Sequence, residues 1–213
     1  QMGIKAELDL RTDSEAKDIN RSVLGSGVTY KRTPLGQTQS HMEGLTNSKA
    51  IYKTALQYVL TCVRNDKPVY FHCAIGRDRT GTLAFLLEGV LGMSKSDIYK
   101  DYELTNFSYF NTPCNKKQLD DMFAAVEEME GETLADKFRK YLVSYIGIPN
   151  TSINTFREKM LEEADDPNGI FEIQGSGFNT QNGSSAIFNL WGQRLSNMQK
   201  GINIVQGKKI LVE

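Results

Sequence analysis

The residues best suited to chemistry in this chain lie in one run of ten, His72-Cys73-Ala74-Ile75-Gly76-Arg77-Asp78-Arg79-Thr80-Gly81. Five residues separate Cys73 from Arg79. A thiolate is a strong nucleophile, and a guanidinium is a planar fork of donors that matches two oxygens of a phosphate group. We therefore expect Cys73 to attack a bound phosphate ester while Arg79 holds the phosphate.

The segments around this run predict a strand, a tight loop and a helix. Residues 68–72 form a short apolar run after a proline, typical of a buried parallel strand, and residues 80–91 are apolar nearly all round. Main-chain N–H groups of such a loop point inward, and the N-terminal end of the helix adds positive potential. The loop should therefore bind an anion and stabilise a thiolate. The residues expected to contact the phosphate are Ala74, Ile75, Gly76, Arg77 and Thr80.

Three further positions support this interpretation. Gly76 lets the backbone turn close to the ligand, Thr80 can hydrogen-bond the sulfur and assist its departure from a phosphocysteine, and His72 is expected to orient the loop from behind. A lone cysteine at a strand end is usually a small buried apolar residue, but here several residue types fall in register on one strand–loop–helix unit. The run lacks the Gly-x4-Gly-Lys-Ser/Thr order of a nucleotide-binding P-loop.

The rest of the sequence predicts an α/β fold with a mostly parallel central sheet flanked by helices. Residues 4–10 and 28–32 are expected strands, residues 37–44 a polar loop, and residues 47–64 an amphipathic helix. Gly92 should end the central helix, and Ser94 should cap the next one. The later helices are expected at about 95–105, 122–129, 134–145 and 153–161.

The pattern changes near residue 165, where short β-like runs begin to alternate with Gly, Asn and Ser. We therefore expect a catalytic domain over residues 1–166 and a small β-rich appendage over residues 167–213.

The formal net charge of the 213 residues is −1, which gives no indication of nucleic-acid binding. No apolar run approaches the ~18 residues of a membrane span, and no CxxC pair suggests zinc. The chain starts without a signal-peptide pattern. Its first residues lead straight into a strand-like segment, so we expect that it has been trimmed before Gln1.

Residues 72–81 resemble the active-site loop HCxxGxxRTG of the protein tyrosine phosphatase superfamily, in the HCxxGKDRTG form of the bacterial tyrosine/lipid phosphatases. Residues 4–15 are similar to the strand LGIKTVIDLRSxxE of that subfamily, residues 101–106 to its DYLLTN helix end, and residues 147–161 to its last helix. The resemblance covers roughly residues 1–163. It implies hydrolysis of phosphotyrosine, and in some cases of phosphoserine, phosphothreonine or phosphoinositides, without a metal or other cofactor.

Two features depart from that pattern. The domains it resembles usually carry further strands before the DLR strand, so we expect an N-terminally short form of the fold, either because the N-terminus has been lost or because the sheet edge is built differently. Arg77 replaces the subfamily lysine and keeps the charge while changing the donor geometry. Beside Arg79 it could form a cationic rim that admits a second phosphate, or it could be a solvated surface arginine.

The leaving group needs a proton donor, and several residues are candidates. The resemblance favours Asp78. Asp9 is the second candidate, because the C-terminal ends of parallel strands share the ligand side of a sheet. Asp9 and Arg11 should therefore lie near the loop, more as an ion pair that supports it than in direct chemistry. His41 and Glu43 are further alternatives. Cys62 and Cys114 are expected to be ordinary thiols.

The tail gives a second resemblance. Residues 188–195 and 200–212 resemble the end of the C-terminal sorting modules of bacterial type IX secretion cargo, which implies a secreted or cell-surface protein. The alternatives are a β-hairpin packed on the catalytic domain and a cytoplasmic location.

The expected partner is a phosphoprotein or phosphoinositide substrate. The alternative functions are a phytase-like inositol-polyphosphate phosphatase and a catalytically silent phosphate-binding surface module. The sequence does not indicate an oligomeric state.

Overall fold

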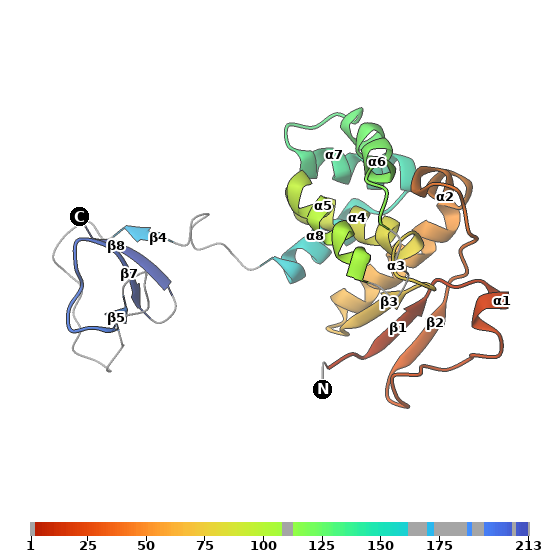
Figure 1. Ribbon diagram of the computed structural model, residues 1–213, viewed down its shortest axis with the longest axis horizontal. Helices are drawn as coiled ribbons and strands as arrows, with labels where there is room; N and C mark the ends of the chain where they lie inside the picture. The colour runs from red at the N-terminus through yellow and green to blue at the C-terminus, as the bar shows by residue number, and fades with distance from the viewer. Residues whose placement is uncertain are drawn as a thin grey trace. The chain divides into compact units, whose positions relative to one another are not determined.

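A computed structural model describes residues 3–107, 113–161, 170–172, 187–188, 194–205 and 208–212 (Figure 1). The chain divides into two compact units, residues 1–161 and 162–213. The domain boundary expected at residue 166 lies outside the described residues. Each unit is therefore considered by itself.

The sheet of the first unit brings three strand ends together. Its described strands are β1 (Ala6–Asp9), β2 (Thr29–Arg32) and β3 (Val69–His72), in the order β2-β1-β3 and all parallel. Every residue of β1 is buried, as the middle strand of a covered sheet requires. In the register Asp9 stands opposite both Arg32 and His72. The C-terminal ends of the strands, and the loop that follows β3, therefore share one edge of the sheet, as predicted.

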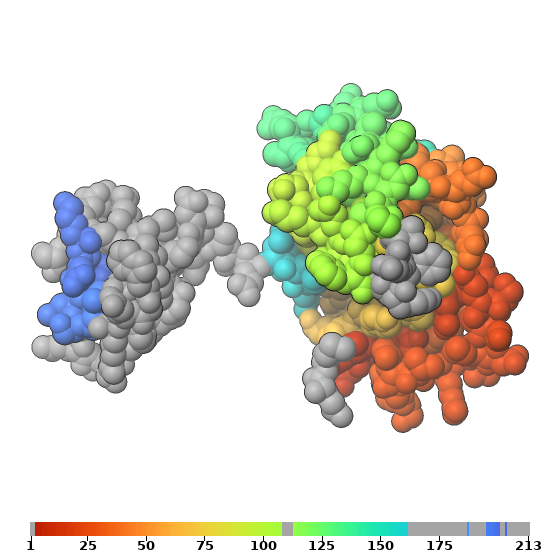
Figure 2. All heavy atoms as spheres, viewed as in Figure 1, coloured from red at the N-terminus to blue at the C-terminus, as the bar shows by residue number. Residues whose placement is uncertain are grey.

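Helices gather over this sheet, with α3 and α4 in contact with its strands (Figure 1). The described helices of the unit are α1 (Asp13–Ala16), α2 (His41–Asn47), α3 (Lys49–Arg64), α4 (Arg79–Leu91), α5 (Lys95–Leu104), η1 (Thr105–Phe107), α6 (Lys117–Glu127), α7 (Leu134–Lys140), η2 (Tyr141–Ile146) and α8 (Asn150–Met160). On the face seen in Figure 2, the yellow-green segment of α5 lies at the surface. The predicted α/β fold is confirmed, and no described helix is long and apolar enough to cross a membrane.

The central position of α4 follows from its sequence. Its apolar side chains are buried on several sides, and the ring of Phe85 packs at 4.9 Å from those of both Phe123 and Phe138. Gly89 permits this approach, because a Cβ atom there would lie 2.3 Å from the Phe138 ring. Gly92 ends α4 with a left-handed φ of 92°, and the Ser94 hydroxyl accepts a bond from the N–H of Asp97 at the start of α5. Both helix-end predictions are confirmed.

One predicted loop is wrong. Residues 37–44 were expected to be a polar loop, but α2 begins at His41. The Ser40 hydroxyl accepts a hydrogen bond from the N–H of Glu43 at 3.0 Å, and the Glu43 carboxylate accepts one from the N–H of Gln39. This Ser-x-x-Glu start signal was present in the sequence. Its consequence is that His41 is held on a helix rather than on an open loop.

The described strands of the second unit form a β-sheet in the order β4-β8-β7-β5-β6. They are β4 (Ile170–Glu172), β5 (Ile187–Phe188), β6 (Arg194–Leu195), β7 (Gly201–Val205) and β8 (Lys208–Val212). β4 and β8 are parallel, and the other pairings are antiparallel. The side chain of Asn203 is buried and bonds the main chain of Gln199 in both directions. The β-rich character expected of this segment is present in its described residues.

Candidate active site

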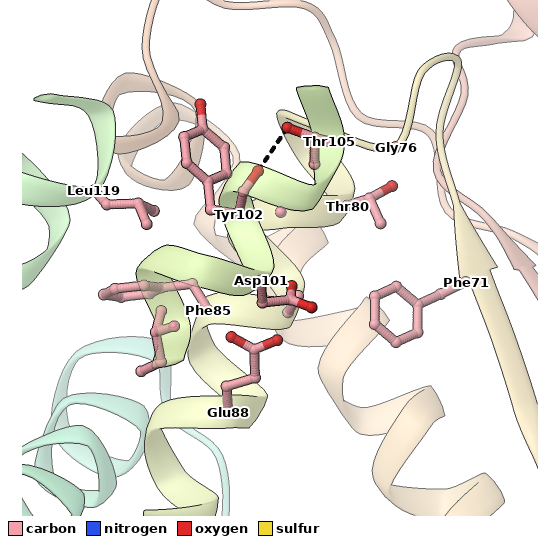
Figure 3. Close-up of a pocket in the computed structure, with 12 residues that line it drawn as sticks. Phe71, Gly76, Thr80, Phe85, Glu88, Asp101, Tyr102, Thr105 and Leu119 are labelled. Carbon is pink, nitrogen blue, oxygen red and sulfur yellow. Dashed lines mark hydrogen bonds between the residues drawn. The ribbon is translucent and has the colours of Figure 1, made fainter. Parts of the chain in front are cut away.

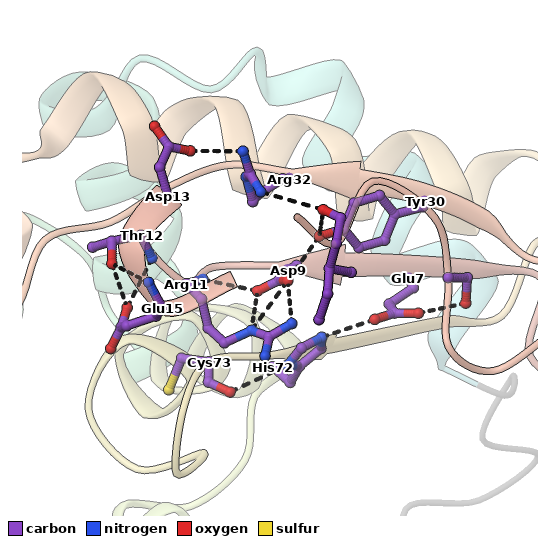
Figure 4. A network of polar contacts seen from close by, with 12 residues as sticks. Glu7, Asp9, Arg11, Thr12, Asp13, Glu15, Tyr30, Arg32, His72 and Cys73 are labelled. Carbon is purple, nitrogen blue, oxygen red and sulfur yellow. Dashed lines mark hydrogen bonds and ion pairs between the residues drawn. The ribbon is translucent and has the colours of Figure 1, made fainter. Parts of the chain in front are cut away.

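Cys73 stands where β3 ends and the loop begins, and Arg79 is the first residue of α4. The exposed fractions of the two residues are 6% and 7%. Between them, Gly76 adopts a left-handed φ of 78°, a conformation that glycine tolerates without strain. In Figure 4 the sulfur of Cys73 points away from His72 and toward the loop. The predicted strand–loop–helix unit is therefore formed around these two residues.

Glu15 holds the guanidinium of Arg79. Nη1 and Nη2 of Arg79 donate to the two carboxylate oxygens of Glu15 at 2.6 and 2.9 Å, and Nη1 also donates to the carbonyl oxygen of Leu35 at 3.1 Å. These bonds use three of the five N–H donors of the side chain. The other two, on Nε and Nη2, lie on one edge and have no protein acceptor among the described residues. They form a second fork of the kind that binds two phosphate oxygens.

Sequence reasoning assigned no role to Glu15. Its carboxylate also accepts bonds from the N–H and hydroxyl of Thr12 and from the side-chain amide of Gln37. The bonds from Arg79, above all, hold the pKa of Glu15 far below its usual range. The pKa of Arg79 is raised, first by Glu15, with a further contribution from the charge of Cys73. The capping-box pattern Thr12-x-x-Glu15 in the sequence predicts that Glu15 lies at the start of α1. It does not predict the contact with Arg79, because the two residues are 64 positions apart in the chain.

Asp78 is paired with His41. The residue precedes the first turn of α4 but makes no side-chain cap there; instead its Oδ1 lies 3.3 Å from Nε2 of His41. The His41 ring is buried edge-on against Tyr102, and its Nδ1 has no hydrogen-bond partner among the described residues. The ring proton is therefore best placed on Nε2, from which it is donated to Asp78. This bond lowers the pKa of Asp78, against the opposing effect of burial, while 55% of the Asp78 side chain remains exposed.

Asp9 and Arg11 form the expected ion pair behind the loop (Figure 4). Asp9 is fully buried and accepts bonds from the N–H, Nε and Nη2 of Arg11 and from the hydroxyl of Tyr30 at 2.8 Å. Burial alone would raise the pKa of Asp9, but the bonds from Arg11 and Tyr30 outweigh it and the pKa is lowered. A carboxylate so fully engaged is suited to support. The arrangement favours the ion-pair interpretation over Asp9 as the proton donor.

His72 is the last residue of β3, and its imidazole ring lies between Glu7 of β1 and the start of the loop. Its Nδ1 is 3.1 Å from the carbonyl oxygen of Cys73, and its Nε2 is 3.0 Å from Oε1 of Glu7. The imidazole is stacked on Tyr70, with ring centroids 5.1 Å apart. The ring thus contacts the loop from behind, at the place where it was expected to orient it.

Two expectations about the loop are wrong. Arg77 is neither a solvated surface residue nor part of an exposed cationic rim, because it is only 7% exposed and donates from Nε and Nη2 to the hydroxyl and carbonyl of Thr105. The hydroxyl of Thr80 is buried without a partner among the described residues, so its predicted bond to the sulfur is not formed in this structure. Arg77 therefore ties the loop to the end of α5.

Comparison with known proteins identifies the family. Residues 1–162 match the sequence profile described as the tyrosine phosphatase family. The chain belongs to the tyrosine phosphatase family. A tyrosine-protein phosphatase from Nostoc commune is 28% identical over 122 residues, which are 49% of this chain and 41% of that protein. A Cupriavidus necator protein provisionally named a tyrosine-protein phosphatase is 36% identical over 55 residues, 26% of this chain and 20% of its own length. The chain thus spans less than half the length of each of these relatives.

A cavity of about 290 Å³ lies beside the loop (Figure 3). Residues of β3, α4 and α5 are among those that line it. Gly76 of the loop and Thr80 in the first turn of α4 line it. The carboxyl groups of Glu88 on α4 and Asp101 on α5 face each other in it, with Phe71 on the other side. Burial, and then the charge of Asp101, raise the pKa of Glu88 to about 8. At neutral pH the carboxyl group of Glu88 therefore keeps its proton.

We expect Glu88→Gln to remove a pH-dependent loss of stability. The folded protein keeps a proton on Glu88 that the unfolded chain releases above about pH 4.5, so stability falls as the pH rises from there to about 8. The variant should match the parent at pH 5 and exceed it at pH 8.5, by on the order of 1 kcal/mol. Thermal unfolding at the two pH values measures this. Glu128→Gln, at an exposed position directly after α6, is the matched control; the same gain there would contradict the assignment to Glu88.

Proposed function

We propose that the chain hydrolyses phosphomonoesters without a metal, through a phosphocysteine on Cys73, and that phosphotyrosine in proteins is its main substrate. The observation that carries the proposal is the guanidinium of Arg79. Glu15 and Leu35 hold it from one side, and its remaining fork is left for a ligand next to Cys73. The family and the names of the two relatives support the same reaction class.

In the proposed first step, the phosphate sits on the main-chain N–H groups of Ala74, Ile75 and Gly76 and on the free fork of Arg79. The sulfur of Cys73 attacks phosphorus, the S–P bond forms, and the bond to the ester oxygen breaks. Asp78 protonates that oxygen, which leaves as a phenol or alcohol. The fork of Arg79 neutralises the charge that spreads over the phosphoryl oxygens during the transfer.

In the second step, water attacks phosphorus and the S–P bond breaks. The Asp78 carboxylate, left unprotonated by the first step, takes a proton from the water. The products are inorganic phosphate and the free thiolate, so that neither an oxidant nor a metal is required. His72 and the Asp9–Arg11 pair are proposed to keep the loop in place during both steps. Phosphoinositides and inositol polyphosphates are less favoured, because Arg77 is turned to Thr105 rather than to an exposed rim.

The test is hydrolysis of p-nitrophenyl phosphate and of a phosphotyrosine peptide by the purified chain without added metal. Acid quenching during turnover should trap one phosphoryl group on the peptide that contains Cys73, as a mass increase of about 80 Da. Phosphoserine peptides, phosphoinositides and inositol hexakisphosphate complete the substrate panel. No turnover of any of these substrates would favour the silent phosphate-binding module instead.

We expect His41→Phe to move the pH dependence of the proton-donor step. A general acid must be protonated, so the rate falls as the pH rises through its pKa. Since His41 lowers the pKa of Asp78, removing the imidazole should raise that pKa and shift the fall in rate to higher pH. Phenyl phosphate, which has a poor leaving group, should show the shift, and an activated aryl ester should show little of it.

Asp78→Asn is the companion variant. With phenyl phosphate, this variant should no longer show the fall in rate that accompanies deprotonation of Asp78 as the pH rises. Its kcat should be lower than that of the parent by about 10²-fold or more. Unchanged turnover of phenyl phosphate by Asp78→Asn would remove Asp78 from the mechanism and direct attention to His41 or Glu43.

We further propose that residues 167–213 act as a C-terminal sorting module, on the strength of the tail resemblance and of the β-strands in the second unit. Fused to a reporter protein in a bacterium with type IX secretion, this segment should direct the reporter to the surface or medium. A reporter that remains inside the cell would contradict the proposal.

A further inference from the structure

The start of α2 is held by a glutamine from a distant part of the chain. α2 and α6 lie side by side (Figure 1). Oε1 of Gln118, in the first turn of α6, accepts a hydrogen bond from the N–H of His41 at 2.8 Å. Nε2 of the same amide donates to the carbonyl oxygen of Gln39 at 3.3 Å. Since the first N–H groups of a helix have no partner within it, Gln118 satisfies one that α2 itself cannot.

An amide is the side chain that suits both of these contacts. A main-chain N–H can only donate and a carbonyl can only accept, and the glutamine amide offers one acceptor and a donor side by side. A carboxylate in its place would leave the carbonyl of Gln39 without a donor. The amide also belongs to a well-anchored helix, because α6 buries the apolar side chains of Leu119, Met122, Phe123 and Val126. Gln118 therefore fixes the first residue of α2 from a rigid support.

The imidazole of His41 has little freedom once α2 is fixed. The exposed fraction of His41 is 2%. Its ring meets that of Tyr102 edge-on with centroids 5.4 Å apart, and a Cβ atom on Gly81 would lie 3.6 Å from its Cε1. Its Nε2 lies 3.3 Å from Oδ1 of Asp78, while its Nδ1 has no hydrogen-bond partner among the described residues. The direction of the ring therefore follows from packing and from the position of the α2 main chain.

We propose that Gln118 is a positioning residue for the proton donor Asp78 and that it acts through His41. The amide fixes the main chain of His41 and thereby aims the ring at Asp78. Both hydrogen bonds of the Gln118 side chain go to main-chain atoms, so its effect on Asp78 is indirect. The inference rests on the proposed function, in which Asp78 is the acid, but the arrangement that it describes can be measured without turnover.

Several groups act on the carboxyl group of Asp78. The hydrogen bond from His41 has the largest effect and lowers the pKa of Asp78. Two guanidinium groups and two phenols also interact with its charge, namely Arg77, Arg79, Tyr52 and Tyr102. Among all these groups, only His41 is bonded to Gln118. Loss of the Gln118 amide should therefore weaken the bond from His41 and raise the pKa of Asp78.

Carbon NMR titration of the Asp78 carboxyl group tests the proposal. Gln118→Leu should raise the pKa of Asp78 by about half a pH unit, and His41→Phe should raise it by more. Because Gln118 acts through His41, Gln118→Leu added to His41→Phe should cause no further change. Gln118→Ala should behave like Gln118→Leu and serves if the leucine variant does not fold. Gln57→Leu, at an exposed position on α3, is the matched control and should leave the titration of Asp78 unchanged.

Two outcomes of this titration would overturn the proposal. One is a pKa of Asp78 that is the same in Gln118→Leu, Gln118→Ala and the unaltered chain. The other is a change that is equally large with and without the imidazole of His41, since Gln118 would then act on Asp78 by another route.

The kinetic consequence is measured with two leaving groups. With phenyl phosphate, Gln118→Leu should shift the fall in rate to higher pH, by the same amount as the carboxyl titration. An activated aryl ester, whose leaving group needs no proton, should be hydrolysed within about 2-fold of the parent rate. Equal losses for both esters would indicate a purely structural role and overturn the proposal. If the titration of Asp78 changes as expected but no phosphate ester is hydrolysed, the proposed function fails and the role of Gln118 stands.

Discussion

Cys73→Ser should lower kcat for p-nitrophenyl phosphate by at least about 10⁴-fold, because a serine hydroxyl is a far weaker nucleophile than a thiolate at neutral pH. The groups proposed to bind phosphate remain in this variant. Arg79 keeps its bonds to Glu15 and Leu35, which do not involve the sulfur. Calorimetric titration with inorganic phosphate should therefore give a dissociation constant within about 3-fold of the parent value.

The chain offers matched controls for this experiment. Cys62 and Cys114 are, like Cys73, free thiols within the described residues. Cys62 lies in α3, and burial raises the pKa of its thiol, which is the opposite of what a nucleophile requires. Cys62→Ser and Cys114→Ser should each keep activity within about 2-fold of the parent. A Cys73→Ser variant that loses less than 10-fold would exclude the phosphocysteine mechanism.

The sheet, the loop and the central helix were predictable because their signals are local. Pro68 and the apolar residues after it mark β3, and alternation of strand and helix patterns predicts a parallel sheet. The turn at Gly76 and the end of α4 at Gly92 follow from backbone freedom at single positions. The register that brings Asp9 beside His72 also follows, because parallel strands share their C-terminal edge.

Contacts between long side chains were not predictable in the same way. Spacing along the chain does not indicate which carboxylate a given arginine reaches. Arg77 and Arg79 show this, since they are two residues apart and equally buried, yet one donates to Thr105 and the other to Glu15. Arg77 lies in the loop and Arg79 begins α4. Only the folded positions of η1, which contains Thr105, and of α1, which contains Glu15, decide their partners.

Arg79→Lys should lower kcat/KM by about 10³-fold. A lysine ammonium is a single point charge on a flexible stem. It cannot hydrogen-bond the carboxylate of Glu15 and two phosphate oxygens at the same time. The bonds from Nη1 and Nη2 to Glu15 leave the Nε edge aligned for the phosphate, and this alignment is what the substitution removes. Steady-state kinetics with p-nitrophenyl phosphate measure the loss. Circular dichroism and thermal unfolding check that the variant is folded.

Two companion variants separate charge from alignment. Glu15→Gln keeps the guanidinium but removes the charge that holds it, and should cost about 10- to 100-fold in kcat/KM, mainly through kcat. Arg77→Lys makes the same substitution two residues away in an equally buried arginine, and should cost less than about 10-fold because a lysine can still reach the oxygens of Thr105. Equal losses for Arg77→Lys and Arg79→Lys would mean that the loop needs only positive charge. A fork fixed by Glu15 would then not be the feature that binds the phosphate.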